Sequence, residues 1–196
     1  MSSDALLSAQ NIEAKIAEIA ESDAPVVSPE TQFLKLALEV KTPVLLSVLN
    51  LVEILTIATN QVVPVFQLPP WVMGVYNWRG DILWVVDLNH LIGCAPWYRQ
   101  ENYASKHTVV VLKGQSKKGL YASGELVLGL AVNRVDDMVI CEPELIKAIE
   151  KLEIPDTINS FLKGSLTEEN GKYYWVLDGE KVLSVMPKEE AIASTA

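Results

Sequence analysis

The sequence predicts a mainly β fold, built from small antiparallel barrels or sandwiches with a few short helices. Apolar residues alternate with period two over many short segments, which is typical of half-buried strands. Gly, Pro or Asp separates most of these segments, so no regular alternation of strands and long helices is expected. At about 150 residues per domain, the 196 residues allow one or two domains, and 49% hydrophobic residues suffice for a real core.

The first predicted strand begins at Gln32. Its apolar residues share one face: Leu34, Leu36, Leu38 and Val40. Pro43 ends the pattern, because proline cannot donate a hydrogen bond to a sheet. Six further strands are expected, at Val44–Ser47, Ile82–Leu88, Thr108–Leu112, Leu126–Val132, Tyr173–Leu177 and Lys181–Val185.

Helical spacing occurs in three places. A helix is predicted from Pro143 to the stop at Pro155, with proline at its permitted first position. Its apolar face would hold Leu145, Ile146, Ile149 and Leu152. The segment Leu49–Ile57 fits a helix or a strand that runs into a helical turn, because apolar runs of this length are ambiguous.

The third helical pattern lies in an acidic tail. Residues 1–30 hold six acidic residues against Lys15, and Ile12, Ile16 and Ile19 recur at helical spacing before Pro25. We therefore divide the chain into a helical or disordered tail (1–30), a main domain of two barrel subdomains (31–187) and a C-terminal tail (188–196).

Charge and cysteine content exclude several classes of protein. A net charge of -9 and a pI near 4.7 oppose binding to nucleic acid, which needs a basic surface. Two cysteines are too few for a disulfide framework, so a reducing compartment is expected. No secretory signal is visible, and polar residues interrupt the longest apolar run, residues 43–58. These features predict a cytoplasmic protein without direct membrane insertion.

An internal echo indicates that the main domain is a duplication. Trp84-Val85-Val86-Asp87 and Trp175-Val176-Leu177-Asp178 have the same aromatic-Val-apolar-Asp order. Each follows a glycine-bearing turn and ends a strand-rich half, so each half is expected to contribute one barrel.

Candidates for catalysis or metal binding are few. His90 lies four residues before Cys94, but no third ligand is near, and His107 is most simply a residue at the edge of a strand. Asp136 and Asp137 read as solvated acids in a turn. We expect no catalytic residue, metal or cofactor, although a small hydrolase that uses His90 or His107 remains an alternative.

The most unusual segment runs from Val63 to Leu88 and holds three of the five tryptophans. Pro69 and Pro70 favour an extended lead-in, and Gly74 allows close backbone approach. Residues 77–80 form a polar hairpin turn between two apolar strands. The turn does not require its arginine, and Trp and Arg are enriched at interface hot spots.

These residues resemble the signature of CheW-like coupling domains of bacterial chemosensory systems. The shared pattern is Val52-Glu53-Ile54, a Val-Pro segment, then Gly-apolar-x-Asn-x-Arg-Gly, a strand and apolar-Val-Asp-Leu. The resemblance spans about residues 31–187 and is looser in the second half, where Leu128–Val132, Val135 and Lys163-Gly164 carry it.

The resemblance implies two five-stranded barrels of the Src-homology-3 type with a shared core. It also implies a non-catalytic adaptor, recruited to membrane-associated receptor arrays in chemotaxis, phototaxis or twitching motility. Its partners would be a chemoreceptor cytoplasmic tip and the regulatory domain of a CheA-type histidine kinase. The implied partner-binding residues are Leu51, Glu53, Gly74, Asn77, Trp78, Arg79 and Gly80 in the first half and Gly129, Val135 and Met138 in the second.

The chain departs from the family pattern in four places, one of which is a first strand turn that lacks its usual glycine. Trp78 replaces a smaller apolar residue, Asn133 replaces an aspartate, and residues 113–124 lengthen a hairpin. A purely internal role is the alternative at the turn, with Arg79 as a brace and Glu53 as its salt-bridge partner. Trp84 is expected in the core. A self-associating structural protein is a further alternative to the adaptor.

Overall fold

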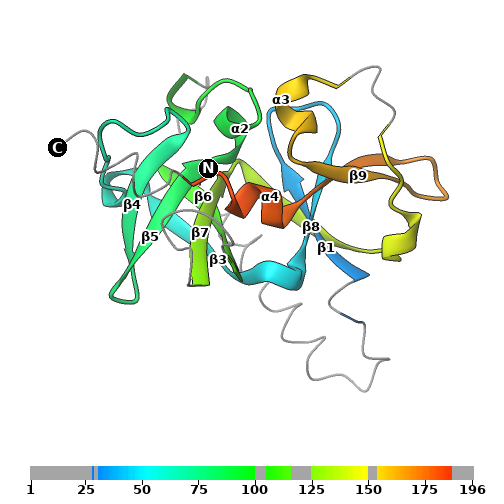
Figure 1. Ribbon diagram of the computed structural model, residues 1–196, viewed down its shortest axis with the longest axis horizontal. Helices are drawn as coiled ribbons and strands as arrows, with labels where there is room; N and C mark the ends of the chain where they lie inside the picture. Colours follow the sequence, from blue (N-terminus) through cyan, green and yellow to red (C-terminus); the bar gives the residue numbers. More distant parts are fainter. Residues whose placement is uncertain (1–27, 29–30, 100–104, 116–124, 150–153, 187–196) are drawn as a thin grey trace.

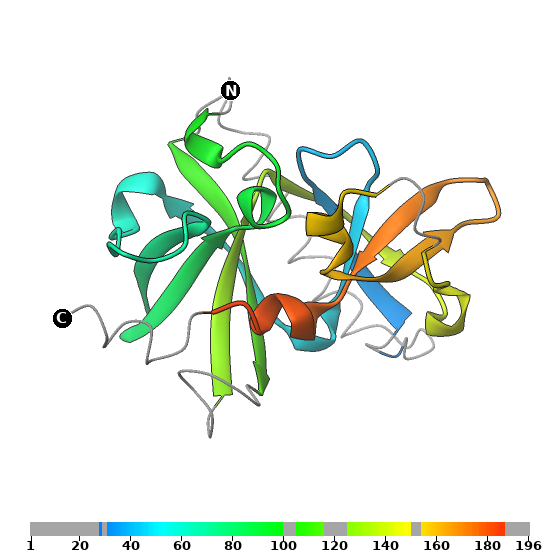
Figure 2. The same cartoon turned by 45° about the horizontal axis from the view of Figure 1, so that its top comes forward.

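Two five-stranded mixed sheets lie side by side in the computed structural model (Figures 1 and 2), which describes residues 28, 31–99, 105–115, 125–149 and 154–186. Sheet A contains, in spatial order, β8 (Arg134–Ile140), β1 (Gln32–Ala37), β2 (Val44–Ser47), β10 (Tyr173–Leu177) and β9 (Leu162–Thr167). Sheet B contains β3 (Leu51–Ala58), β6 (Lys106–Gln115), β7 (Glu125–Val132), β5 (Asp81–Asp87) and β4 (Val72–Trp78). The predictions for the two chain tails lie outside the described residues, as do residues 116–124 of the lengthened hairpin.

Short helices connect the strands. The α-helical turns are α2 (Leu88–Leu91), α3 (Asp156–Asn159) and α4 (Gly179–Leu183). The 3-10 turns are η2 (Val48–Asn50), η3 (Thr59–Gln61), η4 (Trp97–Arg99) and η5 (Pro143–Leu145). In both views α4 lies between the two sheets (Figures 1 and 2).

The sheets curl, and each is closed by the segment that follows an edge strand. After β3, Val63 pairs with Val75 on the opposite edge strand β4. After β8, Lys147 pairs in the same way with Ser165 on the opposite edge strand β9. We call the two closed units barrel A and barrel B, after their sheets; the predicted fold of two five-stranded barrels is confirmed.

The duplication is also visible in the topology, but the two copies exchange hairpins. The hairpin β1–β2 joins β8, β9 and β10 in barrel A, whereas the hairpin β6–β7 joins β3, β4 and β5 in barrel B. The two echoed segments are equivalent strands, β5 and β10. Asp87 and Asp178 then cap the following helices, α2 and α4, by accepting hydrogen bonds from backbone N–H groups.

The sequence predicts antiparallel sheets, but both sheets are mixed, and the exchanged hairpins explain this difference. Strand β5 runs parallel to β7, with Trp84 opposite Leu128, and β10 runs parallel to β2, with Trp175 opposite Val44. In both barrels the echoed strand therefore lies beside a strand from the other half of the chain.

One apolar core extends across both barrels. Its fully buried members from barrel A include Leu34, Leu36, Val44 and Leu46, and those from barrel B include Val86, Val110, Leu128 and Leu130. Trp84 is half-buried against this core, as expected. Each barrel also has its own small interior cluster, so the shared core is the layer between the two sheets.

The structure corrects several local predictions. The expected strand Lys181–Val185 is helix α4, because Asp178 caps its N-terminus and its apolar residues Val182 and Leu183 are buried. The ambiguous segment Leu49–Ile57 is mostly strand β3. Asp136 and Asp137 lie in strand β8 and not in a turn.

The predicted helix from Pro143 is wrong over its described part. A single 3-10 turn ends at Leu145, and Lys147 then exchanges backbone hydrogen bonds with Ser165 at 2.9 and 2.8 Å. Pairing with the edge of β9 outweighs helical spacing here. Residues 150–153 of this prediction lie outside the described part of the chain.

Candidate partner-binding site

The candidate site lies in barrel B, where Glu53 on β3 meets the β4–β5 hairpin. These strands are the two edges of sheet B, so curling of the sheet brings them together. A β-bulge precedes Glu53, since Leu51 pairs with Leu112 whereas Glu53 already pairs with Val111. The bulge re-aims the side chain of Glu53 and leaves Val52 38% exposed.

The hairpin turn has two residues, Arg79 and Gly80, with φ angles of 57° and 94°. Positive φ at both positions is the pattern of a type I′ turn, whose twist matches that of the flanking strands. The carbonyl oxygen of the Asn77 side chain accepts a hydrogen bond from Gly80 N at 3.0 Å. Arg79 adopts this conformation although a left-handed residue other than glycine costs about 1–2 kcal/mol.

Three side chains form a connected cluster. Trp78 Nε1 donates a hydrogen bond to Glu53 Oε1, and Arg79 Nη2 donates to Glu53 Oε2 at 2.9 Å. The Arg79 guanidinium carbon lies 5.2 Å from the centroid of the Trp78 ring, within cation–π range. Glu53 therefore holds both residues by its two carboxylate oxygens.

The cluster is partly internal and partly presented to solvent. The Glu53 side chain is 23% exposed, whereas the Arg79 side chain is 67% exposed. The brace alternative is thus correct about the Arg79–Glu53 ion pair, but the arginine is not an inward residue. Most of its surface is available to a partner.

The other predicted residues have different positions. Gly74 and Gly129 lie in one cross-strand row with Glu53, through the pairs Glu53–Val111, Val111–Gly129, Gly129–Val85 and Val85–Gly74. Both glycines are buried. At Gly74, with φ 143°, a Cβ would lie 2.1 Å from the Val63 carbonyl oxygen, so this glycine permits the closure of barrel B.

Two second-half residues lie in sheet A. Val135 on β8 is 3% exposed and belongs to the shared core. Met138 is half-buried on the same strand, opposite Leu34. Leu51, at the start of β3, is half-buried against the shared core. Gly74, Gly129 and Val135 are therefore buried, whereas the other predicted residues are half-buried or exposed. The structure brings Glu53, Trp78 and Arg79 into contact and places Val135 and Met138 in the other sheet.

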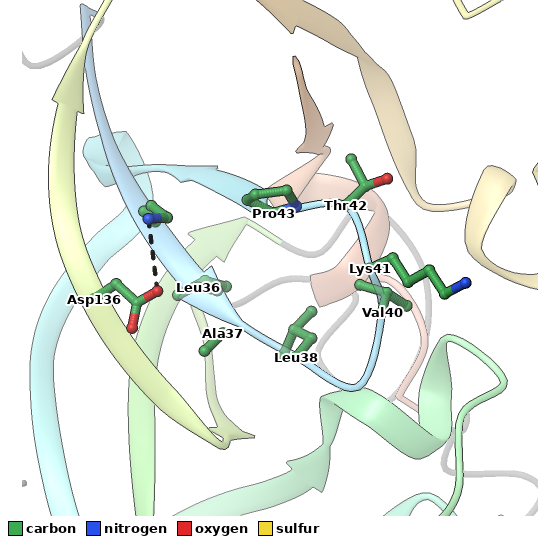
Figure 3. Close-up of a pocket in the computed structure, with 9 residues that line it drawn as sticks. Leu36, Ala37, Leu38, Val40, Lys41, Thr42, Pro43 and Asp136 are labelled. Carbon is green, nitrogen blue, oxygen red and sulfur yellow. Dashed lines mark ion pairs between the residues drawn. The ribbon is translucent and has the colours of Figure 1, made fainter. Parts of the chain in front are cut away.

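An open pocket of about 230 Å³ lies in barrel A, at the end of β1 (Figure 3). The segment from Leu38 to Pro43 forms much of its wall, and Lys35 pairs with Asp136 at 3.7 Å across it. Its lining includes neither histidine, so this pocket does not support the hydrolase alternative.

His107 is packed inside barrel B. It is 7% exposed, its Nε2 lies 3.1 Å from Thr59 Oγ1, and its ring packs edge-on against Trp97. Burial lowers the pKa of His107 below its usual value, although the charge of Asp87 acts in the opposite direction. His90 Nδ1 lies 3.1 Å from the Pro70 carbonyl oxygen, and within the described ranges no three His, Cys, Asp or Glu side chains form a group that could hold a metal ion.

Sequence reasoning missed the bulge at Val52 and the hydrogen bond from Trp78 to Glu53. A bulge leaves no mark in a period-two pattern unless the partner strand is known. The indole contact joins two residues that are 25 positions apart, on strands at opposite edges of one sheet.

Comparisons with known proteins agree with this architecture. No curated protein matches the sequence. Among solved structures, the chain is similar to the scaffolding protein TtCheW from Thermoanaerobacter tengcongensis, with a TM-score of 0.59 and 15% sequence identity. The similarity covers 76% of this chain and 89% of that chain.

None of the helices in the described part of the chain has the length and apolar character needed to span a membrane.

The family model of the CheW-like domain matches residues 32–186, which is most of the chain and includes both barrels. The chain therefore belongs to the family of CheW-like domains.

Proposed function

We propose that this chain is a non-catalytic adaptor that couples chemoreceptor cytoplasmic tips to a CheA-type histidine kinase. Membership of a family of scaffold and adaptor domains supports this function. The adaptor would work in the cytoplasm at membrane-associated receptor arrays, in chemotaxis, phototaxis or twitching motility. One face would bind the receptor tip and another the regulatory domain of the kinase.

The observation that carries the proposal is the Arg79 side chain. The turn holds it in a left-handed conformation, and Glu53 and Trp78 orient it, yet two thirds of its surface is exposed. A guanidinium that is already oriented loses less rotamer freedom when it binds. It can therefore pair with a carboxylate on a partner at low entropic cost.

The surroundings of Arg79 suit an amphipathic helix. Ile82, which pairs with Asn77 in the same hairpin, is 69% exposed, and Val52 beside Glu53 is 38% exposed. An exposed apolar side chain next to a fixed charge, here Val52 beside Glu53, can cover part of a helix stripe and set its register. Ile82 pairs with Asn77 and not with Trp78, so it lies on the other face of the hairpin and extends the apolar surface around the turn. We propose that the receptor-facing surface comprises Leu51, Glu53, Asn77, Trp78, Arg79 and Gly80, with Met138 on the second half.

The test is reconstitution of autokinase activity with this chain, a receptor fragment and the kinase. The Arg79→Ala variant should fail to bind the receptor fragment in a pull-down assay and should fail to raise kinase activity. Its thermal midpoint should stay within a few degrees of wild type, because exposed ion pairs contribute about 0–1 kcal/mol. Arg99→Ala, at an exposed arginine of η4, is the matched control and should behave as wild type.

Two outcomes would reject the proposal. Normal receptor binding by Arg79→Ala would remove this surface from the interface. Equal loss of stability and binding would show that Arg79 is only an internal brace. Light scattering over a concentration series tests the self-association alternative, which predicts a mass that grows with concentration in the absence of partners.

A further inference from the structure

A single residue connects the two sheets at the centre of the chain. Strand β7 of barrel B ends at Val132, strand β8 of barrel A begins at Arg134, and Asn133 lies between them. Rotation about the backbone of one residue changes the direction of the following strand. The contacts of Asn133 therefore bear on the relative orientation of the barrels, together with the link through η2 and the shared core.

Asn133 belongs to a closed ring of hydrogen bonds that joins both barrels. Its Nδ2 donates to Glu39 Oε1 at 2.7 Å, and its Oδ1 accepts from Asn89 Nδ2 at 2.5 Å. Asn89 Oδ1 accepts in turn from the backbone N of Glu39 at 2.7 Å. Glu39 follows β1 in barrel A and Asn89 lies in α2, which follows β5 of barrel B, so each bond of the ring links two different parts of the chain.

The buried member of the ring makes it sensitive to orientation. Asn89 is 3% exposed, and both polar atoms of its side chain are used within the ring. A buried amide that loses its partners is unfavourable, because water does not replace the lost hydrogen bonds. Any arrangement of the barrels that moves Glu39 or Asn133 away from Asn89 would carry this cost.

The shared apolar core does not supply the same directionality. It stabilises contact between the sheets, but the hydrophobic effect depends on buried area and not on angle. Hydrogen bonds require a distance and a direction. A second contact near the ring joins Cys94 Sγ of barrel B to the Glu39 carbonyl oxygen at 3.7 Å, so the same segment of barrel A is held twice.

We infer that Glu39, Asn89 and Asn133 form an orientation lock, which fixes the angle between the barrels and so positions a partner-binding surface to which both contribute. Only the last step of this inference, the positioning of a partner-binding surface, rests on the proposed function. The three residues are positioning residues and are not themselves contacts for the partner.

The test uses the full chain and three variants. Asn89→Leu removes both hydrogen bonds of the buried amide at similar side-chain size. Asn133→Asp places a carboxylate oxygen against Glu39 Oε1 and keeps the acceptor for Asn89. The double variant Glu39→Gln/Asn133→Asp reverses donor and acceptor in that bond and restores it without a carboxylate pair.

Two measurements report on the lock without any partner. Residual dipolar couplings, fitted separately for sheet A and sheet B, give the angle between the barrels. Hydrogen exchange at the Glu39 amide reports the bond to Asn89. In Asn89→Leu we expect exchange to be at least about tenfold faster and the two sheets to lose a common alignment.

The single variant Asn133→Asp should show a smaller change in the same direction, and the double variant should return to wild type. A wild-type angle between the barrels in Asn89→Leu would overturn the lock, as would a double variant no closer to wild type than Asn133→Asp. Because these readouts need no receptor or kinase, failure of the adaptor proposal would leave them interpretable. Receptor binding by Arg79→Ala tests that proposal separately.

Discussion

Glu53 accepts one hydrogen bond on each carboxylate oxygen, from the indole of Trp78 and the guanidinium of Arg79. An internal role and a role in binding are therefore compatible for this cluster. A guanidinium has five N–H donors, and the contact with Glu53 uses one end of the side chain. The rest of the group faces solvent, since the Arg79 side chain is 67% exposed.

The conformation of the turn allows an experiment that separates the internal role of Arg79 from its role in binding. Arg79 has φ 57°, a region that asparagine tolerates better than arginine, and Asn-Gly is the preferred pair for a type I′ turn. We expect Arg79→Asn to keep or raise the free energy of unfolding, by up to about 1 kcal/mol, and to abolish receptor binding. Urea denaturation and a pull-down assay measure the two effects. A stable variant that still binds would contradict the role of the guanidinium.

His107 predicts the pH dependence of stability. Burial holds the pKa of His107 in the folded protein below its usual value, so the unfolded chain binds a proton first as the pH falls. The free energy of unfolding should therefore decrease below about pH 6.5, by at most about 1.4 kcal/mol per pH unit. Urea denaturation at several pH values should show this decrease in wild type and a weaker one in His107→Gln. Equal slopes in the two proteins would contradict the assignment.

At the scale of elements, barrel B closes where β4 meets the segment after β3. Gly74→Ala would place a Cβ 2.1 Å from the Val63 carbonyl oxygen, at the bridge between Val63 and Val75. We expect a loss of about 3 kcal/mol or more in the free energy of unfolding. Gly171→Ala is the matched control: its φ is 83°, but nothing lies within 4 Å of the added carbon, so only the conformational cost of about 1 kcal/mol remains. Equal losses in chemical denaturation would contradict the steric argument.

The elements that the sequence predicts are those whose determinants are local. Period-two alternation identifies β1 and β5, and the Asn-x-Arg-Gly turn identifies the β4–β5 hairpin. By contrast, β9 contains Lys163, Gly164 and Ser165, and β8 carries two adjacent aspartates, so neither shows alternation strong enough to be recognised. These strands exist because neighbouring strands supply their hydrogen bonds and their buried face.

The same division between local determinants and long-range packing applies to the candidate site. Family resemblance and the turn pattern indicate Glu53 and Arg79, which the structure brings into contact. The ring of Glu39, Asn89 and Asn133 has no counterpart in a sequence pattern, because its members are 50 and 44 positions apart. Only the packing of the two barrels brings them together.

At the scale of the whole molecule, neither barrel is a continuous piece of chain. The hairpin β1–β2 belongs to barrel A but leads directly through η2 into β3 of barrel B, and β7 of barrel B leads through one residue into β8 of barrel A. The shared core adds side chains from both sheets to one cluster. These connections favour a single cooperative unit over two independent ones.

Two core truncations test this cooperativity. Leu130 on β7 is fully buried in the shared core, whereas Leu166 on β9 is 1% exposed in the interior cluster of barrel A. Leu130→Ala and Leu166→Ala should each lower the free energy of unfolding by about 2–5 kcal/mol. In the chain, β2 leads through η2 into β3 of barrel B, and β8 follows β7 of barrel B after one residue. Unfolding of barrel A would therefore disturb β3 and β7, so both barrels should unfold together even in Leu166→Ala. Hydrogen exchange of the β6 and β9 amides measures this, and protection that persists in β6 while β9 exchanges freely would show that the barrels unfold separately.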